Sequence, residues 1–331
     1  MSHPSEAKRA DPPVWLFWSA LWVIYIVWGS TYLAIRVTVE TIPPMASASV
    51  RFLVAGILMY GFLLIRRGPQ GVRVNLRELR ACALIGGALL FGGNGIVSVA
   101  EQTVPSALTA LIIAAIPLWV IVLRAVTGDR VSRGTAIGIV LGFGGVALLV
   151  VPGSTEGGGE GVGYLLLVVA SFSWAFGSFL SGKLTLPKDP FTSTAVQMLC
   201  GGAILTVAAL IGGELTGIEP SSFSLSSIAA LGYLVVFGSL LAFTAYTWLL
   251  QNGPISKIST YAYVNPVVAV FLGWLILSEE ITLMIGIGAL LIVTSVAFIV
   301  RNESRVARRV AAEAPPVPVA TNADPELERA R

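Results

Sequence analysis

Polar and aromatic residues that could bind a small solute stand inside an otherwise apolar stretch near the end of the chain. Residues 253–270 read GPISKISTYAYVNPVVAV and hold a lysine, two tyrosines, three hydroxyl side chains, an asparagine and two prolines. At about 100° per residue, these polar side chains cover one half of a helix. A helix in lipid must turn such a half toward protein or water. The candidate solute-binding residues in this stretch are Thr260, Tyr261, Tyr263 and Asn265.

Two further apolar stretches carry aromatic and hydroxyl residues at helical spacing. Trp28, Tyr32 and Arg36 fall on one helical face, and Trp174 and Ser178 fall on one face of the second stretch. Aromatic rings opposite small hydroxyl groups suit a cavity for an amphipathic solute. The alternatives are ordinary helix packing or an aromatic belt at a membrane surface. Trp28, Tyr32, Trp174 and Ser178 are therefore candidate binding residues.

A third face combines an amide, a hydroxyl and a carboxylate. Asn94, Ser98 and Glu101 are spaced i, i+4 and i+7, and Asn94 lies deep enough to require a hydrogen-bond partner. Glu101 stands at the end of its apolar segment, and we favour a hydrated loop charge. If it is buried, it is a candidate proton or cation site.

Arg51 lies within an apolar segment, residues 44–65, seven residues from the segment's start. A charge at that depth is costly unless it is paired or reaches the surface. We favour a structural clamp, with Glu40 and Glu101 as the possible charge partners. Binding of an anionic solute is the alternative.

Several kinds of chemistry are disfavoured by composition. The two cysteines, Cys82 and Cys200, lie in apolar segments, and the single histidine is His3. We therefore expect no metal site, no disulfide framework and no catalytic constellation, and predict that the protein is not an enzyme. GSFLSGK at residues 177–183 lacks the Ser or Thr that follows the lysine of a phosphate-binding loop, so we expect no nucleotide cofactor. Glu279 and Glu280 read as solvated or capping charges of a turn.

The elements that must position these residues are membrane helices. The 331 residues are 55% hydrophobic and 12% charged, whereas soluble domains carry about 25% charged residues. Apolar segments of about 20 residues predict an all-α integral membrane protein with ten transmembrane helices. The predicted spans are residues 15–35, 44–65, 81–100, 105–125, 134–151, 162–182, 191–212, 227–250, 255–277 and 281–300.

The basic residues are distributed unevenly between the loops. Nearly all of the 21 Lys and Arg residues lie in the two tails and in alternate connections, and glutamates dominate the other connections. The positive-inside rule then places both termini in the cytoplasm of a cell whose cytoplasmic membrane holds the chain. Residues 1–14 are expected to form an N-terminal tail, and residues 301–331 a disordered C-terminal tail.

The two halves of the chain resemble each other. An offset of 146 residues aligns Trp28 with Trp174, Pro44 with Pro190, and the Phe-Gly pair at 91–92 with that at 237–238. Repeats at 15–151 and 162–300 would each hold five spans, and an odd number requires opposite orientations in the membrane. Inverted repeats are typical of transporters, whose site lies near the midplane between the repeats.

Four segments resemble EamA-type members of the drug/metabolite transporter superfamily, and most closely its YedA-like branch. They are VWGSTYLAIRV, PPMASASVRFLVAG, FSWAFGSFL and TYAYVNPVVAVFLGWLILSEEIT. The first repeat has Asp129 where many repeats of the family have Glu, which is a looser match. The resemblance implies two inverted five-helix repeats around a central cavity. It also implies movement of small metabolites or drugs, often outward.

The function expected from these observations is secondary transport of a small organic metabolite, amino-acid-like or drug-like, by alternating access and in the export direction. An uptake carrier, a membrane-embedded enzyme and a lipid-handling protein are the alternatives. The expected partners are a small-molecule substrate and the lipid bilayer, with no nucleic acid. Gly134, Gly138 and Gly142 favour close helix packing within or between subunits, so a homodimer stays open.

Overall fold

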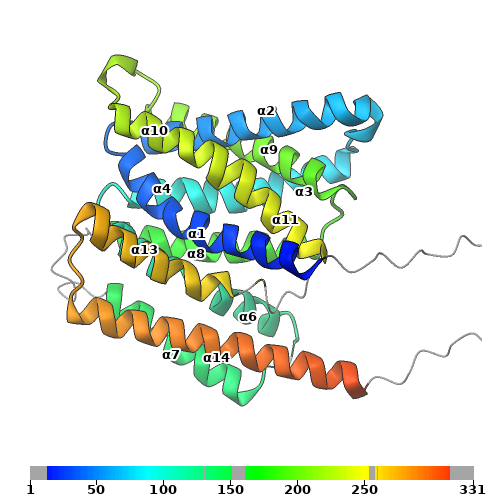
Figure 1. Ribbon diagram of the computed structural model, residues 1–331, viewed down its shortest axis with the longest axis vertical. Coiled ribbons are helices and arrows are strands. Elements are labelled where there is room, and N and C mark those ends of the chain that lie inside the picture. The colour runs from blue at the N-terminus through cyan, green and yellow to red at the C-terminus, as the bar shows by residue number, and fades with distance from the viewer. Residues whose placement is uncertain (1–12, 130, 151–160, 253–257, 259, 314–331) are drawn as a thin grey trace, which may run out of the picture.

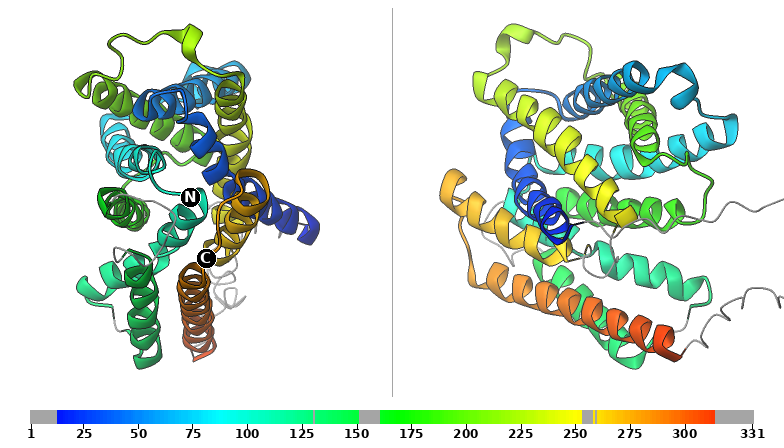
Figure 2. Two further views of the ribbon diagram at one scale, coloured as in Figure 1. Left: turned by 90° about the vertical axis from the view of Figure 1, so that its left-hand side faces the viewer. Right: turned by 45° about the vertical axis from the view of Figure 1, so that its right-hand side comes forward.

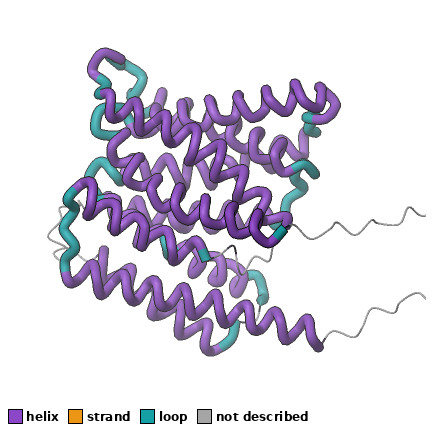
Figure 3. The backbone as a smooth tube through the Cα atoms, in the orientation of Figure 1, coloured by secondary structure: helices purple, strands orange, loops and turns teal. Residues whose placement is uncertain are grey.

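The computed structural model describes residues 13–129, 131–150, 161–252, 258 and 260–313. Over these residues the regular structure is helical, and no strand is present (Figure 1 and Figure 3). The helices are α1 (Val14–Thr38), α2 (Pro44–Gly71), α3 (Leu76–Gly86), η1 (Gly87–Gly95), α4 (Ile96–Ala100), α5 (Ser106–Ile113), α6 (Ile116–Val126), α7 (Arg133–Val150), α8 (Gly161–Ser181), α9 (Pro190–Ile211), η2 (Pro220–Ser222), α10 (Leu225–Tyr233), η3 (Leu234–Leu241), α11 (Ala242–Asn252), α13 (Tyr261–Leu277) and α14 (Leu283–Glu313).

The prediction of an all-α membrane protein is confirmed. Within the described ranges, nine helical segments are long and apolar enough to cross a membrane, and a tenth, Val264–Leu277, is apolar but shorter. This shorter segment corresponds to the predicted span 255–277, of which residues 255–257 and 259 lie outside the described residues. Pro44 and Pro190 occupy the first turn of α2 and α9, where a missing N–H leaves no bond unmade.

One predicted boundary differs from the structure. Helix α14 continues past Arg301 to Glu313, where a disordered tail is predicted to begin at residue 301. The sequence RNESRVARRVAAE contains neither Gly nor Pro and is rich in good helix formers, so it can extend the span as a helix. Charge density alone does not end a helix.

The two halves pack with approximate twofold symmetry. Helices α2 and α9 contact each other, as do α7 and α14, and each pair joins equivalent helices of the two repeats. Helix α1 contacts α13, η3 and α11, and its counterpart α8 contacts the equivalent elements α5 and α6, η1 and α4. Exchanging the repeats therefore maps these contacts onto one another. Figure 2 shows α7 and α14 side by side at one end of the molecule.

The bundle has two sides. Helix α1 begins and α14 ends on one side, here called the terminal side (Figure 1). The α1–α2 and α13–α14 turns lie on the opposite side, here called the far side.

The glycine-rich face of α7 packs against α14 of the same chain. A Cβ at Gly138 would stand 2.7 Å from Ile299 of α14, and one at Gly145 would stand 2.9 Å from Ile292. These small residues let the two helices approach closely, and a homodimer stays a prediction.

Each repeat also carries a π-helical segment in its third span. Segment η1 contains Phe91-Gly92 and segment η3 contains Phe237-Gly238, which are the pairs related by the offset of 146. The wider turn of a π-helix displaces the side chains that follow it from the regular α-helical face. Segment η1 contributes Gly93 and Asn94 to the wall of the site described next, and the Gly238 carbonyl of η3 accepts a hydrogen bond from Trp28 in that wall.

Candidate functional site

A cavity of about 80 Å³ lies between the repeats. First-repeat helices α1, α2, α5 and α6 and segment η1 contribute to its wall, and the second repeat contributes α8, α11 and α13. Seven of the candidate residues from the sequence line it, namely Trp28, Tyr32, Arg51, Asn94, Trp174, Tyr261 and Asn265. They come from segments far apart in the sequence, which the twofold packing brings together.

Aromatic rings form one wall of the cavity around Trp28. The Trp28 ring lies 5.5 Å from the Phe243 ring, 5.5 Å from the Tyr261 ring and 5.0 Å from the Tyr246 ring, measured between centroids. Its indole Nε1 donates to the Gly238 carbonyl, 3.3 Å away, in the π segment η3. Phe243 and Tyr246 are not among the residues predicted from the sequence. Their i, i+3 spacing in AFTAYTW is the signal that was available.

Arg51 brings a buried positive charge to the cavity. Its side chain is 4% exposed, and its Nε donates to Ser239 Oγ at 3.0 Å. An Nη1–H is directed to Asn94 Oδ1 at 3.4 Å, and the guanidinium lies 4.7 Å from the centre of the Phe52 ring. No Asp or Glu in the described part of the chain lies within ion-pair distance of it. Arg51 therefore ties α2 to both π segments, as a clamp would, and also faces the cavity.

Asn265 contributes an unpaired acceptor to the same cavity. The residue is 6% exposed, and its Oδ1 has no hydrogen-bond partner among the described residues. Leaving a buried polar atom unpaired costs about 1–3 kcal/mol. Pro266 follows inside α13 and also lines the cavity. The amide oxygen is therefore available to a donor that enters the cavity.

The fourth span is interrupted at cavity depth. Helix α5 ends at Ile113 and α6 begins at Ile116, and Ala114 between them lines the cavity. Discontinuous membrane helices are frequent at transporter binding sites because their ends expose backbone groups.

Three other candidates, Ser98, Ser178 and Thr260, are not among the described residues that line the cavity. Ser98 Oγ donates to the Asn94 carbonyl at 3.0 Å, and Ser178 Oγ donates to the Trp174 carbonyl at 2.8 Å. Thr260 shares a hydrogen bond with the Tyr25 hydroxyl. The side chain of Tyr263 lies outside the described part of the structure. A binding role for these four residues stays a prediction.

The interpretation of Glu101 as a hydrated loop charge is wrong. The residue is 0% exposed, and neither oxygen of its carboxylate has a hydrogen-bond partner among the described residues. Its backbone carbonyl accepts a hydrogen bond from Arg36 Nη1 of α1, which covers the turn after α4. The position at a span end did not reveal this cover, because burial there depends on other segments of the chain.

Glu279 caps a helix of the other repeat, in agreement with the capping interpretation. Its Oε1 accepts from the Ser106 backbone N–H at 2.7 Å and from Ser106 Oγ at 2.9 Å. Its Oε2 accepts from the Ala107 N–H at 2.9 Å. Ser278, at φ 53° in the left-handed region, turns the chain out of α13 just before Glu279. A carboxylate at a helix N-terminus is favoured by both hydrogen bonding and the helix dipole.

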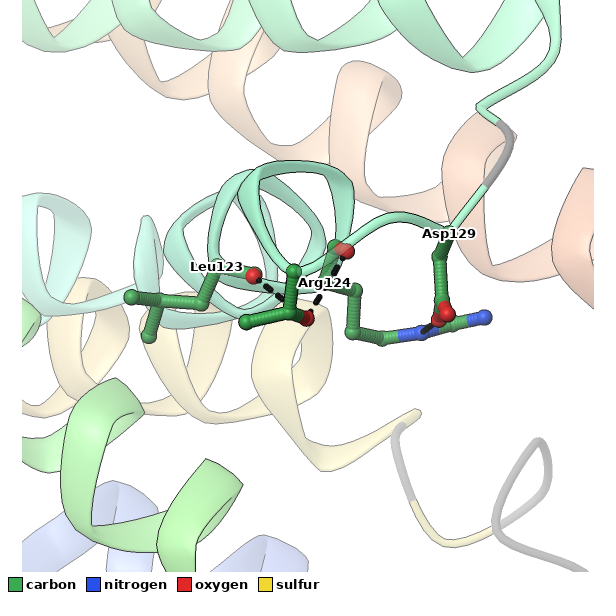
Figure 4. Close-up of polar contacts among 4 residues, drawn as sticks. Leu123, Arg124 and Asp129 are labelled. Carbon is green, nitrogen blue, oxygen red and sulfur yellow. Dashed lines mark hydrogen bonds and ion pairs between the residues drawn. The ribbon is translucent and has the colours of Figure 1, made fainter.

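The first-repeat counterpart of Glu279 is bonded differently. Figure 4 shows Asp129 beside Arg124 at the end of α6, with an Arg124 Nε to Asp129 Oδ2 distance of 2.8 Å. Both side chains are about half exposed, so the pair adds little stability. In the described residues Asp129 closes the end of its own span. Among these residues no cluster of three or more metal-binding side chains occurs.

Comparison with known proteins agrees with this architecture. The model of the EamA-like transporter family matches residues 15–151 and again residues 161–301. The uncharacterized inner membrane transporter YedA of Escherichia coli K12 is 43% identical over 255 residues, which cover 77% of this chain and 80% of YedA. The uncharacterized transporter YoaV of Bacillus subtilis is 24% identical over 271 residues, or 81% of this chain and 91% of YoaV.

One solved crystal structure has the same fold, with a TM-score of 0.60 over 88% of this chain and 97% of its own, at 20% identity. The family match covers both halves of the chain, and the named relatives are transporters. The chain belongs to the EamA-like transporter family and is a multi-pass membrane transporter.

Proposed function

We propose that this transporter moves a small organic solute, amino-acid-like or drug-like, across the cytoplasmic membrane by alternating access between its repeats. Both termini face the cytoplasm, in keeping with the basic residues of the tails and alternate loops. Export is the expected direction, on the resemblance to the family, and uptake is the other outcome of a flux assay.

The proposal rests on the chemistry of the cavity between the repeats. Arg51 offers donors and a positive charge, and the Asn265 Oδ1 offers an unpaired acceptor. Trp28, Trp174 and Tyr261 supply apolar surface beside these groups. A solute with an anionic or acceptor group, a donor group and an apolar body would satisfy all of them.

The size of the cavity supports alternating access. Sites for drug-sized ligands occupy about 300–1,000 Å³, whereas this cavity measures about 80 Å³. A solute larger than a few water molecules therefore needs the repeats to move apart. The residues around the cavity belong to both repeats, so a relative movement of the repeats widens it from one side or the other.

Reconstituted protein in proteoliposomes tests the proposal. A panel of amino acids, their neutral analogues and amphipathic cationic drugs is loaded on either side, and flux of each is followed with and without a proton gradient. We expect flux of at least one class, dependent on Trp174. No flux of any compound in either direction would contradict the proposal. Flux only from the outer side toward the cytoplasmic side would contradict export.

A further inference from the structure

Glu101 is a buried acid that the binding cavity does not account for. It is 0% exposed, both oxygens of its carboxylate lack partners among the described residues, and it does not line the cavity. An ionised carboxylate in such surroundings is costly, whereas its neutral acid needs far less solvation. The geometry therefore favours a proton on Glu101 in this conformation.

The charged and titratable groups around Glu101 come from helices α1, α2 and α8 and from the turn after α13. Burial raises the pKa of Glu101, which follows the span that ends at Ala100, well above its usual value. The Glu279 carboxylate adds to this rise, and the guanidinium groups of Arg36 and Arg51 act against it. The titratable residue of α8, which packs against α4, is Tyr164. The groups concerned are Tyr32 and Arg36 of α1, Arg51 of α2, Tyr164 of α8 and Glu279 after α13.

The nearby Glu279 holds the far side of the two repeats together. Its three hydrogen bonds join the end of α13, in the second repeat, to the start of α5, in the first repeat. We call this contact the far-side latch. Ser106 within it is 0% exposed, so solvent does not reach the start of α5 while the latch is closed. A negative charge on Glu101 repels the latch carboxylate, and a neutral Glu101 does not.

We propose that Glu101 is a proton-binding site that controls the far-side latch, protonated when the latch is closed and ionised when it opens. The proposal rests on the alternating access proposed above and adds the proton as its coupling ion. Opening exposes Glu101 to water and releases the proton on the far side. Closing the latch takes a proton up from that side, so a proton gradient directed toward the cytoplasm favours the closed state.

The sign of the pH dependence follows from this scheme. The closed state holds the proton more tightly than the open state, in which Glu101 is hydrated. The closed state is therefore fully favoured below the usual glutamate pKa of about 4.3 and loses its advantage as the pH rises toward the raised value. Between the two values, opening should increase by up to about tenfold per pH unit.

Cysteine labelling measures this opening without a substrate. The full chain with Cys82→Ala and Cys200→Ala carries Ser106→Cys, which keeps both backbone donors of the latch, and is placed in nanodiscs. Its rate of reaction with a membrane-impermeant maleimide is divided by that of Glu280→Cys in the same background. Glu280 is exposed in the same turn, so the ratio corrects for the general rise of thiol reactivity with pH, and comparison with Glu101→Gln isolates the part due to opening.

The expected result is a ratio that rises with pH in the parent and stays low and flat after Glu101→Gln. The same slope with and without Glu101 would overturn the proposal. If Glu101→Gln fails to fold, Glu101→Asp is used, and loss of the parent's slope in that titratable variant overturns it. Infrared difference spectra should show a protonated carboxyl band at neutral pH that Glu101→Gln removes. Because neither readout needs a substrate, a failed flux assay leaves both tests intact.

Discussion

Trp28 and Trp174, which the internal repeat relates by an offset of 146 residues, meet edge to face with ring centroids 6.3 Å apart. Their ring planes are inclined by 86°. Each repeat thus supplies the same residue to the same cavity wall, one from α1 and one from α8. Edge-to-face packing of this kind contributes about 0.5–1.5 kcal/mol beyond burial alone.

Replacing Trp174 with Ala should lower transport by about tenfold, since the loss of roughly 1.4 kcal/mol of aromatic contact equals one factor of ten. Membrane insertion should be unchanged, because the span stays apolar. Flux in proteoliposomes, normalised to inserted protein, checks this. The matched control is Trp274→Ala, because Trp274 is 54% exposed on α13. Equal flux in both variants would remove Trp174 from the site.

Replacing Arg51 with Gln should reduce transport of solutes that carry a carboxylate by about 10- to 100-fold, because a charge-assisted hydrogen bond contributes about 1.5–3 kcal/mol. Neutral analogues should lose less. Arg51→Lys should recover part of the rate, since it keeps the charge and loses the planar fork. Competition assays with matched acids and amides measure the difference.

Arg66→Gln is the control for this prediction, because Arg66 is exposed near the terminal-side end of the same helix. An equal loss for acids and amides in Arg51→Gln would leave Arg51 with its structural contacts to Ser239 and Asn94 and no role in anion recognition.

Replacing Gly86 with Ala should destabilise the protein by about 1–3 kcal/mol through overpacking. A Cβ at Gly86 would stand 2.5 Å from the backbone carbonyl oxygen of Gln197, so backbone of α3 or α9 must move. Thermal unfolding of the purified protein measures the loss. Gly144→Ala serves as control, because nothing lies within 4 Å of its Cβ position. A Gly86→Ala variant as stable as Gly144→Ala would contradict the prediction, because α3 and α9 would then move apart without a loss of stability.

Asp189 should make stability depend on acid pH. Burial raises the pKa of Asp189, but hydrogen bonds from Thr192 and the Arg67 guanidinium outweigh burial and hold the pKa below its usual value. The ionised form therefore stabilises the folded state above the usual Asp pKa of about 3.9, and this contribution is lost as the pH falls through the lowered value.

Asp189→Ala should accordingly lower the melting temperature at pH 7 and have little effect in strong acid. The Arg67 Nη1 to Asp189 Oδ2 distance of 2.5 Å and the cap on Thr192 both disappear in this variant. Asp129→Ala is the comparison, because its partner Arg124 lies only five residues away, in the last turn of α6, and the pair is about half exposed. A difference between wild type and Asp189→Ala that stays constant with pH would contradict the assignment.

The sequence determined the helical membrane class and the repeat, because hydropathy and the spacing of Pro, Gly and Trp are local properties of the chain. It also selected Trp28, Arg51, Asn94 and Asn265, because a polar or aromatic residue deep in an apolar span needs a partner wherever the helix packs. These residues lie around one cavity in the structure.

Only the tertiary structure decided how those residues face one another and which other groups join them. Phe243 lines the cavity and Tyr246 packs on Trp28, both from α11, and the wider turn of the preceding π segment η3 changes the face that they occupy. Glu101 is buried because α1 covers its turn, and Glu279 caps α5, which is more than 170 residues away in the chain. Such contacts depend on which distant segments pack together. The periodicity of one segment predicts its buried face and does not identify the segments that cover that face.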